Sequence, residues 1–219
     1  MSEGHADSED LAHRDNEAYW LERHRRLQRN LAAVGDISSS EERNLELYAR
    51  KKRRVADLLR ELVGLDLTGV SVLDAGCGIG MIAEMLYVLG ADVSGVDASP
   101  IAIEEARHRC PAGDFRSESL LDFRFEKRFD LTLCIDVLYH VVDDRNWRVV
   151  LGNLVAHTKQ GGSLVLLDQH KDEIQSPASH VRFRTKTLYR DAMSDMNVQD
   201  VTPPDQEIFL VYRVGGIPA

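Results

Sequence analysis

The chain has few cysteines and no long apolar segment. Its 219 residues include only Cys77, Cys110 and Cys134, which are widely spaced and odd in number. This usage disfavours disulfides and zinc sites and is typical of free thiols in a reducing compartment. No run of about 18 apolar residues is present, so we expect no membrane span. The polar first residues, MSEGHADSED, lack the apolar core of a secretory signal, and we therefore expect a cytoplasmic protein.

The sequence also has fewer positively than negatively charged residues. Lys and Arg number 27 against 36 Asp and Glu, which gives a formal net charge of −9. A general nucleic-acid binder needs a positive surface to neutralise phosphates, so this class is disfavoured. The remaining composition, 43% hydrophobic and 29% charged, is that of an ordinary globular protein. The length favours a single main domain, and we expect no metal site.

The N-terminal part of the sequence is predicted to be helical. Apolar side chains recur at three- and four-residue steps over residues 17–33, which predicts a first helix. Ser39 and Glu42 have the spacing of a capping box, which predicts a second helix reaching about Val63. Its expected apolar face consists of Leu45, Tyr48, Val55, Leu59 and Leu62. We expect residues 1–67 to form a tail and helical cap.

From Val70 onward, short apolar runs alternate with amphipathic stretches, the pattern of βαβ units and a parallel sheet. The expected strands are 70–74, 92–97, 114–117, 130–136, 163–168, 198–202 and 208–214, the last two as an antiparallel hairpin. The expected helices are 79–89, 100–109, 143–158 and 188–196. The sequence therefore predicts an α/β fold: a doubly wound, mostly parallel seven-stranded sheet over residues 68–219, with an N-terminal helical cap.

A glycine-rich turn follows the first predicted strand, with the pattern D-x-G-x-G-x-G from Asp74 to Gly80. Such a turn before a helix brings main-chain N–H groups and a positive helix end up to a ligand. The dinucleotide pattern G-x-G-x-x-G fails here because Met81 stands at the last glycine. A carboxylate at Asp74 would repel a pyrophosphate but suits a ligand with a cationic group. Asp97, at the end of the second predicted strand, suits ribose hydroxyls. Separately, the turn could be a plain tight turn and Asp97 a surface acid; together they favour a nucleoside-type ligand.

Four segments carry a family resemblance: VLDAGCGIG, VSGVDAS, FDLTLCIDVLYHV and LVAHTKQGGSLVLLD. With them the chain resembles the class I S-adenosylmethionine-dependent methyltransferases over about residues 68–170. Gln160 stands where the family usually has proline. The resemblance implies the Rossmann-like methyltransferase fold, S-adenosyl-L-methionine as cofactor and S-adenosyl-L-homocysteine as its product. It makes residues 68–219 the catalytic domain.

The resemblance also implies which residues contact the cofactor. Asp74 would lie near its ammonium group, Gly76 and Gly78 against its methionine part, and Asp97 at its ribose. The full implied set is Asp74, Ala75, Gly76, Cys77, Gly78, Asp97, Ala98, Glu118, Ser119, Leu120, Ile135 and Asp136. Ser119 takes a position where the family carries an acid near the adenine, and Glu118 could serve instead. Ile135 and Asp136 have ordinary strand-end packing as an alternative.

The methyl acceptor is expected near His140. A sulfonium cofactor is already activated, so the protein mainly aligns a nucleophile and excludes water. A hydroxyl nucleophile also benefits from a base, and an imidazole titrates near neutrality. His140 is therefore the predicted catalytic base; its alternative is to cap or pack under the loop. A carboxylate acceptor would need no base.

Other residues are predicted to contact the acceptor. In SHVRFRTKTLYR, His180, Arg182 and Arg184 alternate, so an extended segment would point all three one way. They would form an anion clamp or a solvated polar face. Tyr19 and Trp20 either belong to the core or line the site under an N-terminal lid. The predicted acceptor contacts are Tyr19, Trp20, Tyr139, His140, His180, Arg182 and Arg184.

These predictions add up to a methyl transfer to a small molecule, most simply O-methylation of a hydroxyl or carboxylate. The acceptor could be anionic, and the chain is loosely similar to methyltransferases of sugar and secondary-metabolite modification. One alternative is a peptide, protein or RNA methyltransferase, although the net charge disfavours RNA. Another is a non-catalytic cofactor-binding protein, which the intact glycine turn and Asp97 disfavour.

Overall fold

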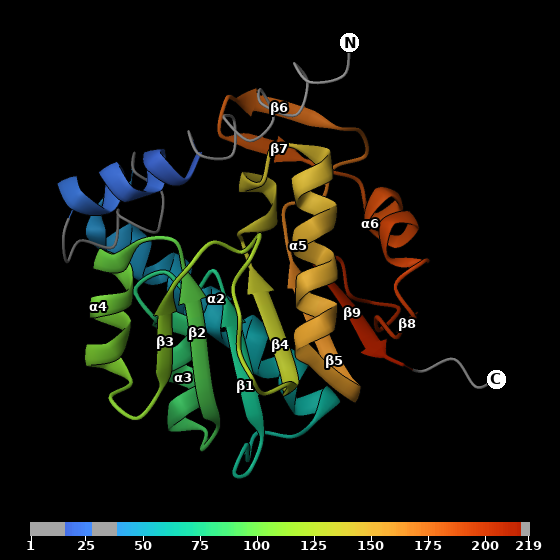
Figure 1. Ribbon diagram of the computed structural model, residues 1–219, viewed down its shortest axis with the longest axis horizontal. Coiled ribbons are helices and arrows are strands. Elements are labelled where there is room, and N and C mark those ends of the chain that lie inside the picture. The colour runs from blue at the N-terminus through green and yellow to red at the C-terminus, as the bar shows by residue number, and fades with distance from the viewer. Residues whose placement is uncertain (1–15, 28–38, 216–219) are drawn as a thin grey trace. The chain divides into compact units, whose positions relative to one another are not determined.

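The computed structural model describes residues 16–27 and 39–215. The chain divides into two compact units, one made of Trp20–Glu118 and the other of Met1–Tyr19 with Ser119–Ala219. Figure 1 labels the helices and strands of both units. This division does not coincide with the predicted boundary after residue 67, so the cap remains a prediction. Residues 16–26 are helical, where the first helix was expected. The rest of that predicted helix lies mostly outside the described residues.

The unit Trp20–Glu118 is a three-stranded parallel sheet with helices. Its elements are α2 (Glu41–Leu62), β1 (Ser71–Ala75), α3 (Met81–Val88), β2 (Asp92–Asp97), α4 (Pro100–Arg109) and β3 (Asp114–Ser117). Strand β2 lies between β1 and β3 and pairs with both in parallel. Helices α3 and α4 pack on these strands and on each other. Ser99 caps α4 through its side chain, as its sequence predicted.

Helix α2 differs from the sequence prediction in its N-cap and in its buried face. Ser40, not Ser39, is the N-cap, because its Oγ accepts the N–H of Arg43 at 3.2 Å. The third helical position is thus Arg43, which leaves no acid to complete a capping box. Leu45, expected on the apolar face, is 52% exposed. Asn44 is buried instead and donates to the carbonyl oxygen of Ser40 at 3.2 Å.

The second unit contains the remaining strands. Its elements are β4 (Phe129–Ile135), the 3₁₀ turn η2 (Leu138–His140), α5 (Asp144–His157), β5 (Thr158–Leu167), β6 (Gln175–Ala178), β7 (Val181–Phe183), α6 (Lys186–Met193), β8 (Val198–Asp200) and β9 (Phe209–Val214). Strands β4 and β5 are parallel, while β5 with β9 and β8 with β9 are antiparallel. Helix α5 packs on β4 and β5. Strands β6 and β7 form a separate hairpin that the sequence did not predict.

The fold class is confirmed. Within the described residues the main sheet has seven strands in the order β3-β2-β1-β4-β5-β9-β8, mostly parallel with an antiparallel end. Strand β5 begins earlier than expected, at Thr158. Its register with β4 jumps between the pairs Phe129–Thr158 and Leu131–Ser163, so the part of β5 before the expected start at residue 163 pairs irregularly with β4. Gly161 there has a left-handed φ of 74°.

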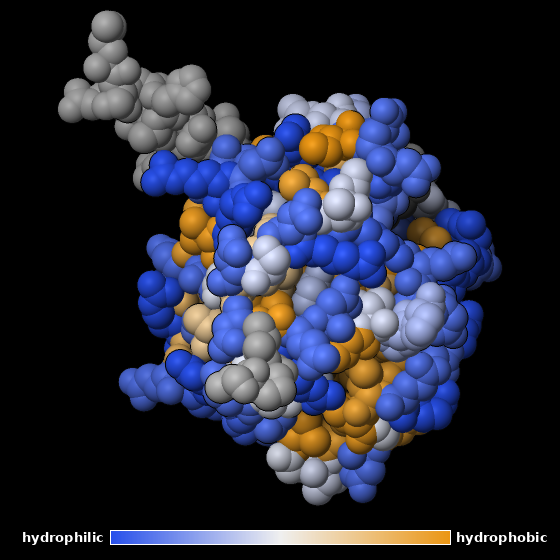
Figure 2. All heavy atoms as spheres, turned by 90° about the vertical axis from the view of Figure 1, so that its right-hand side faces the viewer, coloured by the Kyte–Doolittle hydropathy of each residue, from blue (hydrophilic) through white to orange (hydrophobic). Residues whose placement is uncertain are grey.

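The three cysteines are buried and free, as predicted. Among the described residues, no helix has the length and apolar character needed to cross a membrane. On the side of the second unit that carries α6, β8 and β9, the surface is largely hydrophilic with apolar areas between the polar ones (Figure 2).

Candidate active site

The glycine turn links the end of β1 to the start of α3 in the unit Trp20–Glu118. Gly76, Gly78 and Gly80 have φ values of 75°, 50° and 80°, a region that residues with side chains rarely adopt. The N–H of Gly78 donates to Oδ2 of Asp97 at 3.0 Å, and that of Ser99 donates to Oδ1 at 2.9 Å. The N–H of Gly76 donates to the carbonyl oxygen of Val96 at 2.7 Å. Hydrogen bonds thus hold the turn to the end of β2.

Position 80 also requires a glycine for a packing reason that does not involve a ligand. A Cβ atom at this position would lie 2.9 Å from Cα of Ala106 in α4. Because both atoms belong to packed elements, the clash could not be relieved by a side-chain movement. The close packing of α3 on α4 therefore requires a glycine here, in addition to the left-handed backbone.

Asp74 carries the strongest electrostatic feature of this unit. Its side chain is 2% exposed, and Oδ2 has no hydrogen-bond partner within the part of the chain described. Burial raises the pKa of Asp74 to about 7, with a further rise from the charge of Asp97 and opposing effects from a main-chain hydrogen bond of Ala83 and from Lys51. An unsatisfied buried carboxylate oxygen is costly, and a cationic donor would satisfy it. The site therefore fits the ammonium group of the predicted cofactor.

His24 interacts electrostatically with Asp97, and the sequence predicted no role for it in cofactor binding. It lies in the helix of residues 16–26 and is 3% exposed, and neither ring nitrogen has a described hydrogen-bond partner. Burial lowers the pKa of His24, while the negative charge of Asp97 acts in the opposite direction. The helix therefore brings an imidazole within the electrostatic reach of the predicted ribose-binding acid. The only signal was its place four residues after Trp20, on the same helical face.

The other predicted cofactor residues fall into both units. Ala75 and Cys77 are buried beside the turn, and Glu118 donates its N–H to the carbonyl oxygen of Asp97 at 3.1 Å. Ala98 follows Asp97, and its carbonyl oxygen accepts from the Ser117 hydroxyl at 3.4 Å. The remaining four belong to the second unit, and their part in a cofactor site stays a prediction: Ser119, Leu120, Ile135 and Asp136.

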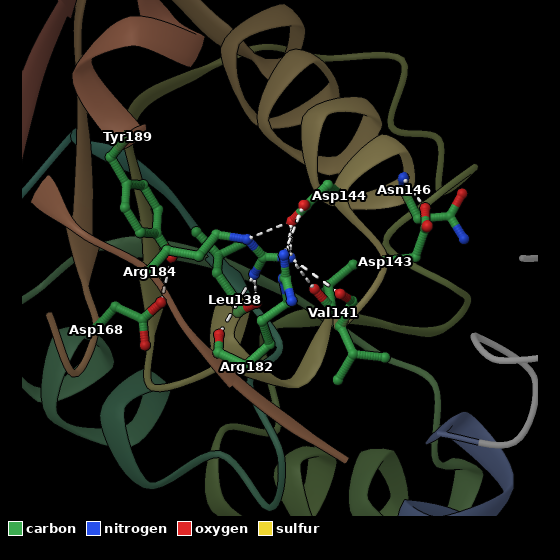
Figure 3. Close-up of polar contacts among 10 residues, drawn as sticks. Leu138, Val141, Asp143, Asp144, Asn146, Asp168, Arg182, Arg184 and Tyr189 are labelled. Carbon is green, nitrogen blue, oxygen red and sulfur yellow. Dashed lines mark hydrogen bonds and ion pairs between the residues drawn. The ribbon is translucent and has the colours of Figure 1, made fainter. Parts of the chain in front are cut away.

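In the second unit, two carboxylates follow the ends of the parallel strands β4 and β5. Asp136 has a left-handed φ of 57°, and its N–H donates to the carbonyl oxygen of Leu167 at 2.8 Å. Asp168 is 3% exposed and accepts a hydrogen bond from the Tyr189 hydroxyl (Figure 3). It also accepts the N–H of Gln169 at 2.9 Å. Burial raises the pKa of Asp168 to about 7, and the charge of Asp136 adds to this rise. Sequence reasoning did not single out Asp168, because its burial depends on α6. Within the described residues no group of three candidate metal ligands occurs.

His140 lies in η2, just after β4, and its ring has a defined tautomer. Nδ1 lies 2.9 Å from the main-chain carbonyl oxygen of His180. A carbonyl oxygen can only accept, so Nδ1 carries the hydrogen and, in the neutral ring, the lone pair is on Nε2. The Asn16 side chain donates to the carbonyl oxygen of His140. These contacts hold the ring and the main chain of His140 in one orientation.

Aromatic rings surround His140 within the second unit. The centroid of the Tyr139 ring lies 4.2 Å from that of His140, and the rings of Tyr19 and His180 stack at 4.3 Å. The His140 and His180 rings are nearly parallel, with centroids 6.0 Å apart. Four of the predicted acceptor residues are therefore brought together, although they come from three distant parts of the sequence.

Arg182 and Arg184 make a different contact from the one expected. Arg182 Nη2 lies 2.9 Å from Oδ2 of Asp144, and Arg184 Nη2 lies 2.9 Å from its Oδ1 (Figure 3). The Arg184 side chain is fully buried. The two guanidinium groups thus pair with a carboxylate of the protein itself. This pairing disfavours the predicted anion clamp, which remains untested.

Comparisons with known proteins define the class. The chain matches the family described as "Methyltransferase domain" over residues 19–197 and belongs to that family. The predicted family is thereby confirmed.

Part of the chain is similar to curated O-methyltransferases. A ubiquinone biosynthesis O-methyltransferase from Xanthomonas euvesicatoria pv. vesicatoria is 35% identical over 108 residues, which are 47% of this chain and 44% of that protein. Its mitochondrial counterpart from Schizosaccharomyces pombe is 38% identical over 106 residues, covering 45% and 38% of the two chains. The matched region is thus less than half the length of these curated relatives.

A solved structure supports the fold over nearly the whole chain. The magnesium protoporphyrin IX methyltransferase of Synechocystis PCC 6803, crystallised with bound SAM, has a TM-score of 0.70 and 18% identity and covers 93% of this chain and 97% of its own. At this identity the likeness extends to the fold alone.

Proposed function

We propose that this chain is an S-adenosylmethionine-dependent methyltransferase that methylates a small molecule at oxygen, in a hydroxyl or carboxylate group. One observation carries the proposal: the buried Asp74 beside the glycine turn has a carboxylate oxygen without a described partner. Family membership supports the methyltransferase class, and the names of the curated relatives support transfer to oxygen. The buried free thiols support a reducing compartment such as the cytoplasm.

The residues of the turn would hold the cofactor. Asp74 would accept from its ammonium group, and Asp97 would accept from the ribose hydroxyls. Oδ2 and Oδ1 of Asp97 each accept one main-chain N–H, and a carboxylate oxygen can accept more than one hydrogen bond. When bound, the cofactor supplies a methyl group activated by a sulfonium. His24, buried within reach of Asp97, supports the role of the N-terminal helix as part of a cap.

His140 would remove the proton of a hydroxyl acceptor. Nε2 takes the proton as the oxygen becomes nucleophilic, and the carbonyl of His180 stabilises the resulting imidazolium through the Nδ1–H bond. General-base catalysis of this kind contributes about 10² to 10⁴ in rate. Tyr19, Tyr139 and His180 would border the acceptor. Arg182 and Arg184 already pair with Asp144, so they do not support a separate binding site for an anionic group of the acceptor.

The test combines binding with turnover. Calorimetry with S-adenosylhomocysteine should give a micromolar or tighter dissociation constant; absence of binding would overturn the proposal. Hydroxylated and carboxylated small molecules should then be screened with radiolabelled methyl donor. Binding without transfer to any of them would favour a non-catalytic protein, and tight binding of labelled RNA at physiological salt would favour the RNA alternative.

A variant pair tests the base. His140→Ala should bind S-adenosylhomocysteine as the wild type does and lose turnover of a hydroxyl acceptor by about 100-fold or more. His108→Ala removes an exposed histidine of α4 and should leave turnover unchanged. Wild-type turnover in His140→Ala would end the base assignment.

A further inference from the structure

One short segment, residues 180–184, holds the turn that carries His140 at several points. The His180 carbonyl accepts from Nδ1 of the His140 ring at 2.9 Å. Arg184 Nη1 donates to the carbonyl oxygen of Leu138 at 3.4 Å, and Arg184 Nη2 donates to that of Val141 at 2.8 Å. These carbonyls flank His140 on both sides in the sequence. The ring and the main chain around it are therefore held by the same strand, β7 and its ends.

Arg184 has several contacts of its own. It is fully buried, and its Nε lies 3.0 Å from Oδ1 of Asp144 (Figure 3). Its guanidinium carbon lies 4.6 Å from the centre of the Trp147 ring. Burial would raise the pKa of Asp144, but hydrogen bonds from Arg182 and Arg184 outweigh this and lower it. Asp144 therefore stays ionised near neutral pH, and the buried guanidinium keeps a charged partner. Removing one partner of a buried ion pair of this kind is strongly destabilising, because it leaves the other charge buried and unpaired.

Only an arginine can make these contacts together. The guanidinium presents five N–H donors in a planar fork, so it reaches the Asp144 carboxylate and the carbonyls of Leu138 and Val141 at once. A lysine ammonium at the same place would keep the charge but not this spread of donors. Replacing Arg184 by lysine therefore tests the geometry of the donors while the positive charge is kept.

We propose that Arg184 is a positioning residue for His140: it fixes the Leu138–Val141 turn so that Nδ1–H of His140 meets the His180 carbonyl and Nε2 faces the acceptor with its lone pair. This inference rests on the proposed role of His140 as a base. It assigns Arg184 to the orientation of that base, in place of the substrate contact that the sequence suggested. The β6–β7 hairpin is then a support for the catalytic turn.

The test uses Arg184→Lys in the full chain. We expect kcat for a hydroxyl acceptor to fall about 10- to 100-fold, with affinity for S-adenosylhomocysteine within about twofold of wild type. The pH profile of kcat should shift toward lower pH, because the carbonyl that stabilises the protonated ring is displaced. Arg184→Lys combined with His140→Ala should be no slower than His140→Ala alone, since the two residues act as one unit.

A control and a second variant keep the test decisive. Arg148→Lys alters an exposed arginine whose guanidinium carbon lies 6.0 Å from the same Trp147 ring, and should leave kcat and its pH profile unchanged. If Arg184→Lys does not fold, Asp144→Asn, which weakens the anchor of Arg184, should produce the same changes in smaller measure. Wild-type kcat and pH profile in a folded Arg184→Lys or Asp144→Asn would overturn the proposal.

A readout independent of turnover separates this inference from the proposed function. Nitrogen NMR of the imidazole should show His140 with hydrogen on Nδ1 in the wild type and a mixture of tautomers in Arg184→Lys. An unchanged Nδ1–H tautomer in the variant would overturn the positioning role even if His140 proves to be the base. Wild-type turnover in His140→Ala, with the tautomer change present, would instead remove the base role and leave the structural coupling.

Discussion

The main-chain N–H of Gly78 lies 3.0 Å from Oδ2 of Asp97, and this hydrogen bond joins the glycine turn after β1 to the acid at the end of β2. The two motifs that suggested a nucleoside-type ligand are therefore parts of one site. Because β1 and β2 are parallel neighbours, their carboxyl ends meet at the same edge of the sheet. The proposed cofactor contacts depend on this relationship.

Replacing Asp97 should weaken cofactor binding. A single hydrogen bond to a charged group contributes about 1.5–3 kcal/mol, so the loss of even one ribose contact in Asp97→Ala should weaken binding of S-adenosylhomocysteine by at least roughly 10- to 100-fold. Calorimetry measures the change, and circular dichroism checks that the variant is folded. Asp92→Ala, at the exposed start of the same strand, serves as the control and should bind normally. Equal affinities for both variants would contradict the ribose assignment.

Cofactor affinity should depend on pH through Asp74. The pKa of this group in the unliganded protein is raised to about 7, and a bound ammonium group favours the ionised form. Binding near neutrality therefore releases a proton, and affinity should rise with pH up to about 7 and then level off. Below that value it should fall by up to about tenfold per pH unit. Asp74→Asn should bind weakly with no such dependence between pH 5 and 8; an undiminished dependence in this variant would assign the effect elsewhere.

The Tyr189–Asp168 hydrogen bond should stabilise the fold more at high pH than at low pH. Tyr189→Phe removes a donor to a buried carboxylate, which costs about 1–3 kcal/mol when Asp168 is ionised. The pKa of Asp168 is raised to about 7, so in the folded protein the carboxyl is mostly protonated at pH 5 and ionised at pH 8. The loss of unfolding free energy, measured with urea, should therefore be larger at pH 8.

Tyr212→Phe is the matched control for this hydroxyl deletion. Tyr212 is 2% exposed, and its hydroxyl has no hydrogen-bond partner among the described residues. Removing it should change stability little or raise it slightly at both pH values. A similar loss in both variants would mean that hydroxyl burial, not the bond to Asp168, sets the effect.

Gly80→Ala should destabilise the protein. A left-handed backbone costs a residue with a side chain about 1–2 kcal/mol, and the clash with Ala106 adds to this. Gly152→Ala, in α5, meets no atom within 4 Å and should stabilise by about 0.5–1 kcal/mol. Thermal unfolding of the two variants measures the difference; a shift of the same sign in both would refute the packing argument.

Local signals predicted the elements that depend on local chemistry. Ser99 followed by Pro100 begins α4 as expected, because a hydroxyl cap and a fixed φ act within one turn. At α2 two adjacent serines could each cap the helix, and only the observed bond to Arg43 distinguishes Ser40 from Ser39. The β6–β7 hairpin escaped prediction because its sequence has little apolar alternation. The hydrogen-bonded ion pair between Arg184, just after β7, and Asp144 joins residues that are 40 positions apart in the sequence.

The sequence by itself determined the fold class, the methyltransferase family and the residues of the glycine turn, because periodicity, glycine placement and strand-end acids are properties of short segments. Tertiary structure alone decided which polar groups are buried and what each one meets. Contacts between distant residues bury Asp74 with an unsatisfied oxygen and bring His24 close enough to Asp97 to interact electrostatically. They also set the hydrogen bond from Tyr189 to Asp168 and the tautomer of His140. Burial and hydrogen-bond partners set protonation, so the chemistry of the site follows from the fold and not from the motif.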